Sequence, residues 1–119
     1  MERRSFLLSI AAPLLGADES IIDIHQHTNY TGRSDDELVA HQRKMGVSKT
    51  VLLPAGSKYG LAAQAGGNDT VVAVAKRYPR EYVYFANELP DIPEAEQVIR
   101  KYLNTGAIGI GEQKFPVES

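Results

Sequence analysis

The alternation of short apolar runs with helical segments is the feature that most constrains the fold of this chain. The apolar runs cover residues 20–25, 49–55, 81–88 and 107–115, and the helical segments between them cover 34–46, 69–78 and 92–104. Strands that are separated by single helices pair in parallel through right-handed crossovers. The order therefore predicts an α/β fold with one parallel sheet, either open and doubly wound or half of a (β/α)₈ barrel.

Cap residues indicate where these helices begin. Ser34 and Glu37 form an S-x-x-E capping box, and Asp91 with Glu94 forms a comparable pair. Asn68 is expected to be the N-cap of the helix between them. The last helix has the clearest apolar period, which runs through Ala95, Val98, Ile99, Tyr102 and Leu103.

Composition excludes several classes of protein and of site. The chain has 119 residues, which fits one domain, and its 43% of apolar residues is typical of a globular protein. The formal net charge is −2 and no basic cluster follows the first four residues, so no nucleic-acid surface is expected. The chain has no cysteine, so a metal ion would need histidine, carboxylate or lysine-derived ligands.

The N-terminal segment differs from the rest of the chain. Two arginines precede an apolar stretch, residues 6–17, that is too short to span a bilayer but fits the apolar region of an export signal. The sequence RRSFL also resembles the twin-arginine signal. We therefore expect residues 1–17 to direct export to the periplasm or the exterior, and residues 18–119 to form the domain. Without use of that signal the chain would stay in the cytoplasm.

Two histidines follow the first apolar run. His25 and His27 are two residues apart, so in a strand they point to the same face, at the carboxyl end where parallel sheets build their sites. Two neutral imidazoles placed in this way can bind one divalent ion, and zinc is the first candidate. Asp23 has the same parity and is expected to hydrogen-bond behind the ligands. His41 lies within a helix and is expected to be structural.

The fourth apolar run carries a second polar group. Ile108, Ile110, Glu112 and Lys114 share one parity, with the two isoleucines deep in the strand and Glu112 at its carboxyl end. Glu112 is therefore expected to reach the level of the two histidines and to act as a third ligand. The alternative is a solvated Glu–Lys pair beyond the end of the strand.

Together these residues resemble the amidohydrolase superfamily of metal-dependent hydrolases. IDIHQHT, residues 22–28, is similar to its first-strand H-x-H motif, and GAIGIGEQKF, residues 106–115, is similar to its fourth-strand segment. The resemblance implies the N-terminal half of a TIM-type barrel, with zinc held by His25, His27 and Glu112, or by Lys114 if that residue is carboxylated. It also implies that metal-activated water attacks an amide, ester or related carbonyl centre of a small molecule, although some members decarboxylate instead.

The same resemblance implies residues that this sequence does not contain. The family also uses histidines from the fifth and sixth strands and an aspartate from the eighth, and a whole barrel takes about 250 residues. We therefore expect this chain to need a C-terminal half or a partner chain, to be inactive alone, and to lack the catalytic base, which would lie beyond residue 119.

Other interpretations remain open at this point. DIHQHT also matches the first motif of histidinol-phosphatase-like phosphoesterases, and IGE matches a motif of TatD-type nucleases. A non-catalytic α/β protein could instead bind a ligand through the glycine-rich loop 55–67. Asn87 and Glu88, at the end of the third strand, would contact substrate or cap the turn before Pro90.

Overall fold

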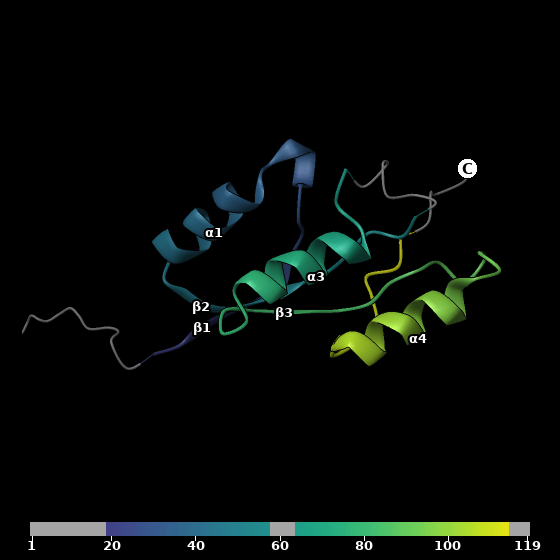
Figure 1. The fold of residues 1–119 in the computed structure, drawn as a ribbon. Coiled ribbons are helices and arrows are strands. Elements are labelled where there is room, and N and C mark those ends of the chain that lie inside the picture. The colour runs from purple at the N-terminus through teal and green to yellow at the C-terminus, as the bar shows by residue number, and fades with distance from the viewer. Residues whose placement is uncertain (1–18, 58–63, 115–119) are drawn as a thin grey trace, which may run out of the picture.

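The computed structural model describes residues 19–57 and 64–114. The predicted export segment, residues 1–17, lies outside these ranges. The described chain forms three parallel strands in the order β1-β2-β3, which confirms the α/β class. The strands are β1 (Ile21–Gln26), β2 (Val47–Leu52) and β3 (Tyr82–Tyr84), as Figure 1 shows.

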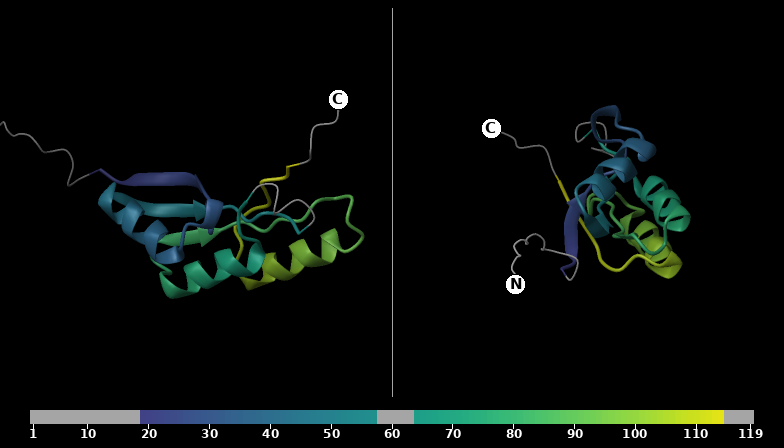
Figure 2. Two further views of the ribbon diagram at one scale, coloured as in Figure 1. Left: turned by 90° about the horizontal axis from the view of Figure 1, so that it is seen from above. Right: turned by 90° about the vertical axis from the view of Figure 1, so that its left-hand side faces the viewer.

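Within the described residues, a short 3₁₀ turn and one α-helix connect β1 to β2, a second α-helix precedes β3, and a third follows it. They are η1 (Tyr30–Gly32), α1 (Asp35–Lys44), α3 (Asn68–Arg77) and α4 (Ala95–Thr105). All three α-helices lie on one side of the sheet, and in the two views of Figure 2 the opposite side is bare of helices. Burial agrees with this arrangement, because Leu52 and Tyr84 are buried against the helices, whereas Ile22 and Ile24 are 58% and 73% exposed.

The core lies between the sheet and the helices. Its apolar members come from α1, α3, β2 and β3: Leu38, Val39, Leu52, Val71, Val74, Ala75, Tyr82 and Tyr84. Helix α4 is attached to this core by two tyrosine hydroxyl groups. Tyr102 donates a hydrogen bond to Asp69 on α3, and Tyr84 donates one to the Thr105 carbonyl at 2.8 Å.

The predicted fourth strand is reduced to one parallel bridge between Ala86 and Ile110. The segment still runs beside β3, because Gly111 donates a main-chain hydrogen bond to Ala86 and the Ala86 amide donates to Gly109, both at 2.9 Å. Glycine weakens a strand, and a Cβ atom at Gly109 would come within 2.9 Å of the Phe85 ring. Close approach to that ring thus sets the path of residues 107–112 more than strand propensity does.

Cap predictions had mixed outcomes. The capping box of α1 is confirmed, with Ser34 Oγ accepting from the Glu37 amide at 3.1 Å and Glu37 Oε1 accepting from the Ser34 amide at 3.0 Å. Asn68 is the first residue of α3 and not its N-cap, because its side chain binds the main chain of Asn87 instead. The second box is also wrong: α4 begins at Ala95, after a turn in which Ala95 donates to the Ile92 carbonyl.

Substitution of Leu38 by alanine should destabilise the domain strongly. Leu38 is fully buried in the core, and removal of a buried leucine costs about 2–5 kcal/mol of unfolding free energy. Met45→Ala is the matched control, because Met45 is 59% exposed and its loss should cost less than about 0.5 kcal/mol. Urea unfolding followed by circular dichroism measures both, and equal losses would contradict the described core.

Stability should fall at alkaline pH through Tyr102. Its hydrogen bond to Asp69, aided by burial, raises the pKa of Tyr102 from 10.0 to about 12. A pKa raised by folding means that the protonated phenol stabilises the fold fully below 10.0, and that this contribution is lost as pH rises toward about 12. Burial raises the pKa of Tyr82 similarly, so Tyr102→Phe should reduce the alkaline fall without abolishing it. Urea unfolding midpoints of the parent and of Tyr102→Phe, measured across this pH range, test this. If the bond to Asp69 does not form, the midpoints of the two proteins will fall equally with pH.

Candidate metal centre

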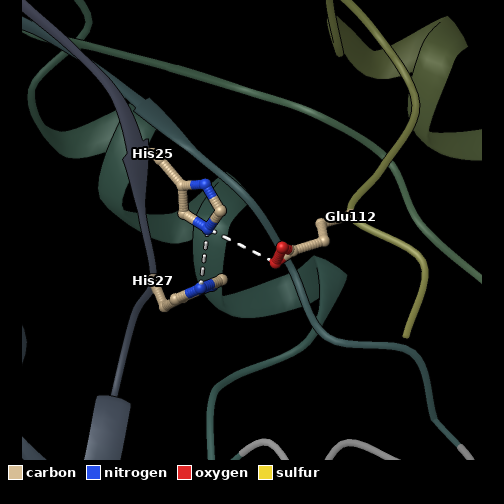
Figure 3. Close-up of side chains that lie close together, drawn as sticks. All are labelled: His25, His27 and Glu112. Atoms are coloured by element: carbon tan, nitrogen blue, oxygen red, sulfur yellow. Dashed lines mark hydrogen bonds and ion pairs between the residues drawn. The ribbon is translucent and has the colours of Figure 1, made fainter. Parts of the chain in front are cut away.

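His25, His27 and Glu112 come together at the carboxyl edge of the sheet, as Figure 3 shows. His25 lies near the end of β1, His27 follows that strand, and Glu112 follows the bridge at Ile110. The Nε2 atom of His25 is 3.3 Å from Nε2 of His27 and 3.3 Å from Oε2 of Glu112. One potential ligand atom from each residue lies within 4.8 Å of the other two.

These distances suit a tetrahedral zinc ion. With bonds of roughly 2.0–2.1 Å, neighbouring ligand atoms of such an ion are about 3.4 Å apart. Of the three distances between the potential ligand atoms, the two from His25 Nε2, to His27 and to Glu112, therefore have the required length. In addition, Glu112 Oε2 is buried yet accepts no hydrogen bond, so its interactions are the ion pairs with His25 and Lys114. The three residues thus fit a zinc ion by distance and by the chemistry of their donor atoms.

The orientation of His27 is set by a main-chain carbonyl. Its Nδ1 atom lies 2.9 Å from the oxygen of Leu53, which can only accept, so Nδ1 carries the proton. In the neutral ring the lone pair is then on Nε2, which faces His25 and the centre of the site. The ring of Tyr30 stacks on His27 with centroids 5.7 Å apart, and Arg33 donates to the His27 carbonyl at 2.9 Å.

Asp23 does not take the position that strand parity predicts. Asp23 pairs with Thr50 and Gln26 with Leu52, so β1 uses one residue more than β2 over this interval. Asp23 lies between the exposed Ile22 and Ile24 and therefore faces the helix side, and the extra residue after it breaks the alternation that would have kept it in line with the histidines. There its Oδ2 accepts from the side-chain amides of Gln42 and Gln26, each at 2.9 Å.

Support from Asp23 to the site passes through the main chain. Its Oδ1 accepts from the backbone amide of His25 at 3.1 Å, and among the described residues no hydrogen bond joins this carboxylate to an imidazole. Burial opposes ionisation of Asp23, but the hydrogen bonds from Gln42, Gln26 and the His25 amide outweigh it and lower the pKa of this carboxyl. Asp23 is thus an anion that fixes the end of β1.

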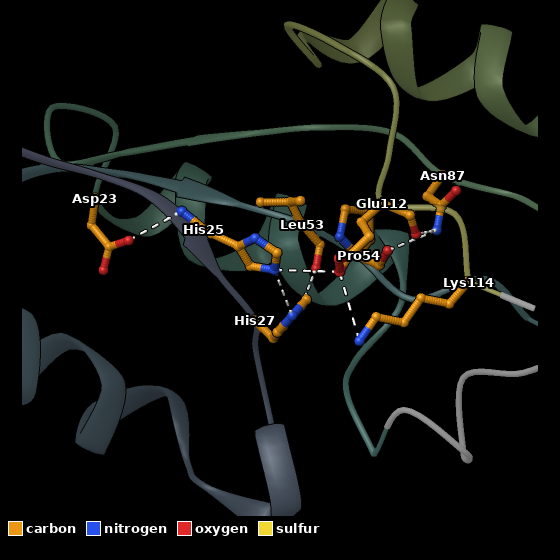
Figure 4. A network of polar contacts seen from close by, with 8 residues as sticks. All are labelled: Asp23, His25, His27, Leu53, Pro54, Asn87, Glu112 and Lys114. Carbon is orange, nitrogen blue, oxygen red and sulfur yellow. Dashed lines mark hydrogen bonds and ion pairs between the residues drawn. The ribbon is translucent and has the colours of Figure 1, made fainter.

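Lys114 contacts the same oxygen of Glu112 as His25 does. Its Nζ lies 3.7 Å from Glu112 Oε2, and its side chain is exposed. Figure 4 shows this contact within the wider network of polar contacts. A cavity of about 20 Å³ borders His27, Pro54, Glu112 and Lys114, which is enough for one water or one ion. The structure therefore brings Lys114 to the site as an ion-pair partner of Glu112.

The remaining predicted residues have different positions. Asn87 and Glu88 are 1% and 4% exposed, and both bind main-chain groups. Glu88 Oε2 accepts from the amides of Ser57 and Leu89, so the hydrogen bonds match the turn-capping alternative. His41 is exposed on α1, where its Nδ1 bonds Gln42 Oε1. It lies outside the candidate ligand group, which consists of His25, His27 and Glu112.

Three contributors to the site were not found in the sequence. They are the Leu53 carbonyl, Arg33 and Asn68. A carbonyl leaves no mark in the sequence, Arg33 lies in a polar segment that carries no motif, and Asn68 was expected only as a helix cap. Only pairing of the strand ends brings them to His27 and Asn87.

No family model, curated protein or solved structure matches this chain. Among the described residues, no helix combines the length and apolarity that a membrane crossing requires.

In the metal-free chain, His27 should be the Nδ1-protonated tautomer. Free histidine favours the other tautomer, but the Leu53 carbonyl fixes the proton on Nδ1. Ring ¹⁵N chemical shifts, assigned through a His27→Gln variant, measure this directly. The same chain in urea, where the carbonyl is lost, is the control. A folded chain whose His27 carries its proton on Nε2 would contradict the described orientation.

Proposed function

We propose that this chain carries the metal centre of an amidohydrolase-type hydrolase, with zinc held by His25, His27 and Glu112. The observation that carries the proposal is the set of three donor atoms within 4.8 Å of one another, two pairs of which are at 3.3 Å. Two imidazoles and one carboxylate are a typical donor set for catalytic zinc. When bound, such an ion polarises a carbonyl and makes a nucleophile from water at neutral pH.

The chain's own residues have definite tasks in this proposal. His27 offers its bare Nε2, while Nδ1 stays bonded to Leu53. In the metal-free chain the Nε2 proton of His25 faces the bare Nε2 of His27 at 3.3 Å, and that proton must leave before the His25 nitrogen can coordinate. Glu112 supplies the negative charge. Lys114 shares Glu112 Oε2 and must yield that contact.

Access to the site supports a catalytic role over a structural one. Structural zinc sites are closed by four protein ligands, whereas catalytic sites keep one position open. Three ligands are present in this group, and the side chain of His25 is 51% exposed. A small-molecule substrate can therefore approach from the His25 side.

The arrangement of helices favours half of a (β/α)₈ barrel over an open, doubly wound sheet. In a barrel the helices lie on the outer face alone, and the site lies at the carboxyl ends of the strands. Within the described residues, α1, α3 and α4 lie on one side of the sheet (Figure 2), and His25, His27 and Glu112 lie together at the carboxyl end of β1. In this proposal the catalytic base and the remaining strands come from a C-terminal half or from a partner chain.

Zinc binding tests the centre. Calorimetric titration should give one ion per chain, and His27→Gln or Glu112→Gln should weaken binding at least about 10-fold because each removes a ligand. His41→Gln is the matched control and should bind as the parent does, since His41 lies outside the ligand group. A parent chain that binds no zinc, or a control variant that loses as much affinity as His27→Gln, would overturn the assignment.

Hydrolysis is tested separately from binding. The zinc-loaded protein should be assayed with activated esters and amides and with phosphodiesters. The proposal expects carbonyl substrates to be cleaved and the activity to be lost on chelation or in His27→Gln. Cleavage of phosphodiesters alone would favour the phosphoesterase alternative, and a chain indifferent to chelators would favour a binding protein.

A further inference from the structure

Asn87 lies where three chain segments meet beside the ligand group. It follows β3, and its side chain donates one hydrogen bond to the Pro54 carbonyl, after β2, at 3.0 Å. The same nitrogen donates a second to the main-chain carbonyl of Glu112 at 2.7 Å (Figure 4). Both protons of the amide are thus used on carbonyls that belong to two other segments.

The main chain of Asn87 is itself fixed by Asn68. The Asn68 side chain accepts from the Asn87 amide at 2.9 Å and donates to the Asn87 carbonyl at 2.7 Å. This reciprocal pair attaches the end of β3 to the first residue of α3. A continuous path of hydrogen bonds therefore runs from a core helix through Asn87 to the main chain of Glu112.

The orientation of the Asn87 amide follows from its neighbours. Two carbonyl oxygens face the side chain, so its donating nitrogen must point toward them, and Oδ1 is left buried without a hydrogen-bond partner. Asn87 is only 1% exposed, so water does not replace these contacts. The two donated bonds are therefore what the side chain contributes at this position.

Hydrogen bonds also hold the two neighbours of Glu112: Gly111 donates to the Ala86 carbonyl, and the side chain of Gln113 donates to the Glu88 carbonyl, each at 2.9 Å. The segment still forms one bridge and no regular strand, and Ile110 is 53% exposed. Regular strand pairing therefore does not by itself set the position of residue 112. Among the described residues, Asn87 is the one whose side chain donates a hydrogen bond to the main chain of Glu112 itself.

We propose that Asn87 is the positioning residue of the metal centre, which holds Glu112 at the distance from His25 that a zinc or cobalt ion requires. This inference rests on the proposed function, since it assumes that Glu112 is a ligand. It differs from a substrate-binding role, because Asn87 acts through the main chain of Glu112 and does not reach the open side of the site.

A double-mutant cycle on Co²⁺ affinity tests this role. Asn87→Asp keeps the shape of the side chain but removes both donated protons, so Co²⁺ affinity, followed by visible absorption, should fall about 10–100-fold. If Asn87 acts through Glu112, Asn87→Asp combined with Glu112→Gln should bind no more weakly than Glu112→Gln alone. Combined with His27→Gln, the Asn87→Asp loss should instead add.

Two controls separate positioning from general destabilisation. Leu38→Ala weakens the core at a distance from the ligands and should bind Co²⁺ as the parent does. If Asn87→Asp fails to fold by circular dichroism, Asn87→Ala removes the same donors without adding charge and takes its place in the cycle.

The outcomes distinguish this inference from the proposed function. Parent-like affinity of the Asn87 variants, or a loss that adds to that of Glu112→Gln, overturns the positioning role and leaves the zinc centre standing. Parent-like affinity of Glu112→Gln itself removes Glu112 from the ligand set and overturns both.

Discussion

Parallel pairing of β1 with β2 is the constraint on which the candidate site depends. It places the ends of both strands at one edge, so that the Leu53 carbonyl after β2 meets the His27 ring after β1. That single hydrogen bond fixes the tautomer that leaves Nε2 bare. The irregular register after Asp23 acts in the same place, because it breaks the alternation between Asp23, which faces the helix side, and the histidines.

Glu112, the third member of the candidate site, has a different kind of support. It follows a segment without regular strand pairing, and its position comes from main-chain bonds beside β3 and from the Asn87 amide. Its carboxylate oxygen is shared by His25 and Lys114.

Much of the fold could be predicted because local signals were strong. The apolar runs, the helical periods between them and the Ser34–Glu37 capping box depend on residues close in sequence, and three strands and three helices formed as predicted. The fourth strand failed because glycines and the Phe85 ring decide the path of that segment. Asn68 failed as a cap because Asn87, distant in sequence, binds its side chain.

The sequence by itself determined which donor atoms are present and that His25 and His27 share one face, because alternation along a strand is a local property. The tertiary structure alone decided that Glu112 lies 3.3 Å from His25 and within 4.8 Å of His27, that Asp23 faces the helices, and that Asn87 bonds the main chain of Glu112. Each of these three features depends on strand register or on contacts between segments far apart in the chain. The spacing of residues in the sequence reveals neither register nor such contacts.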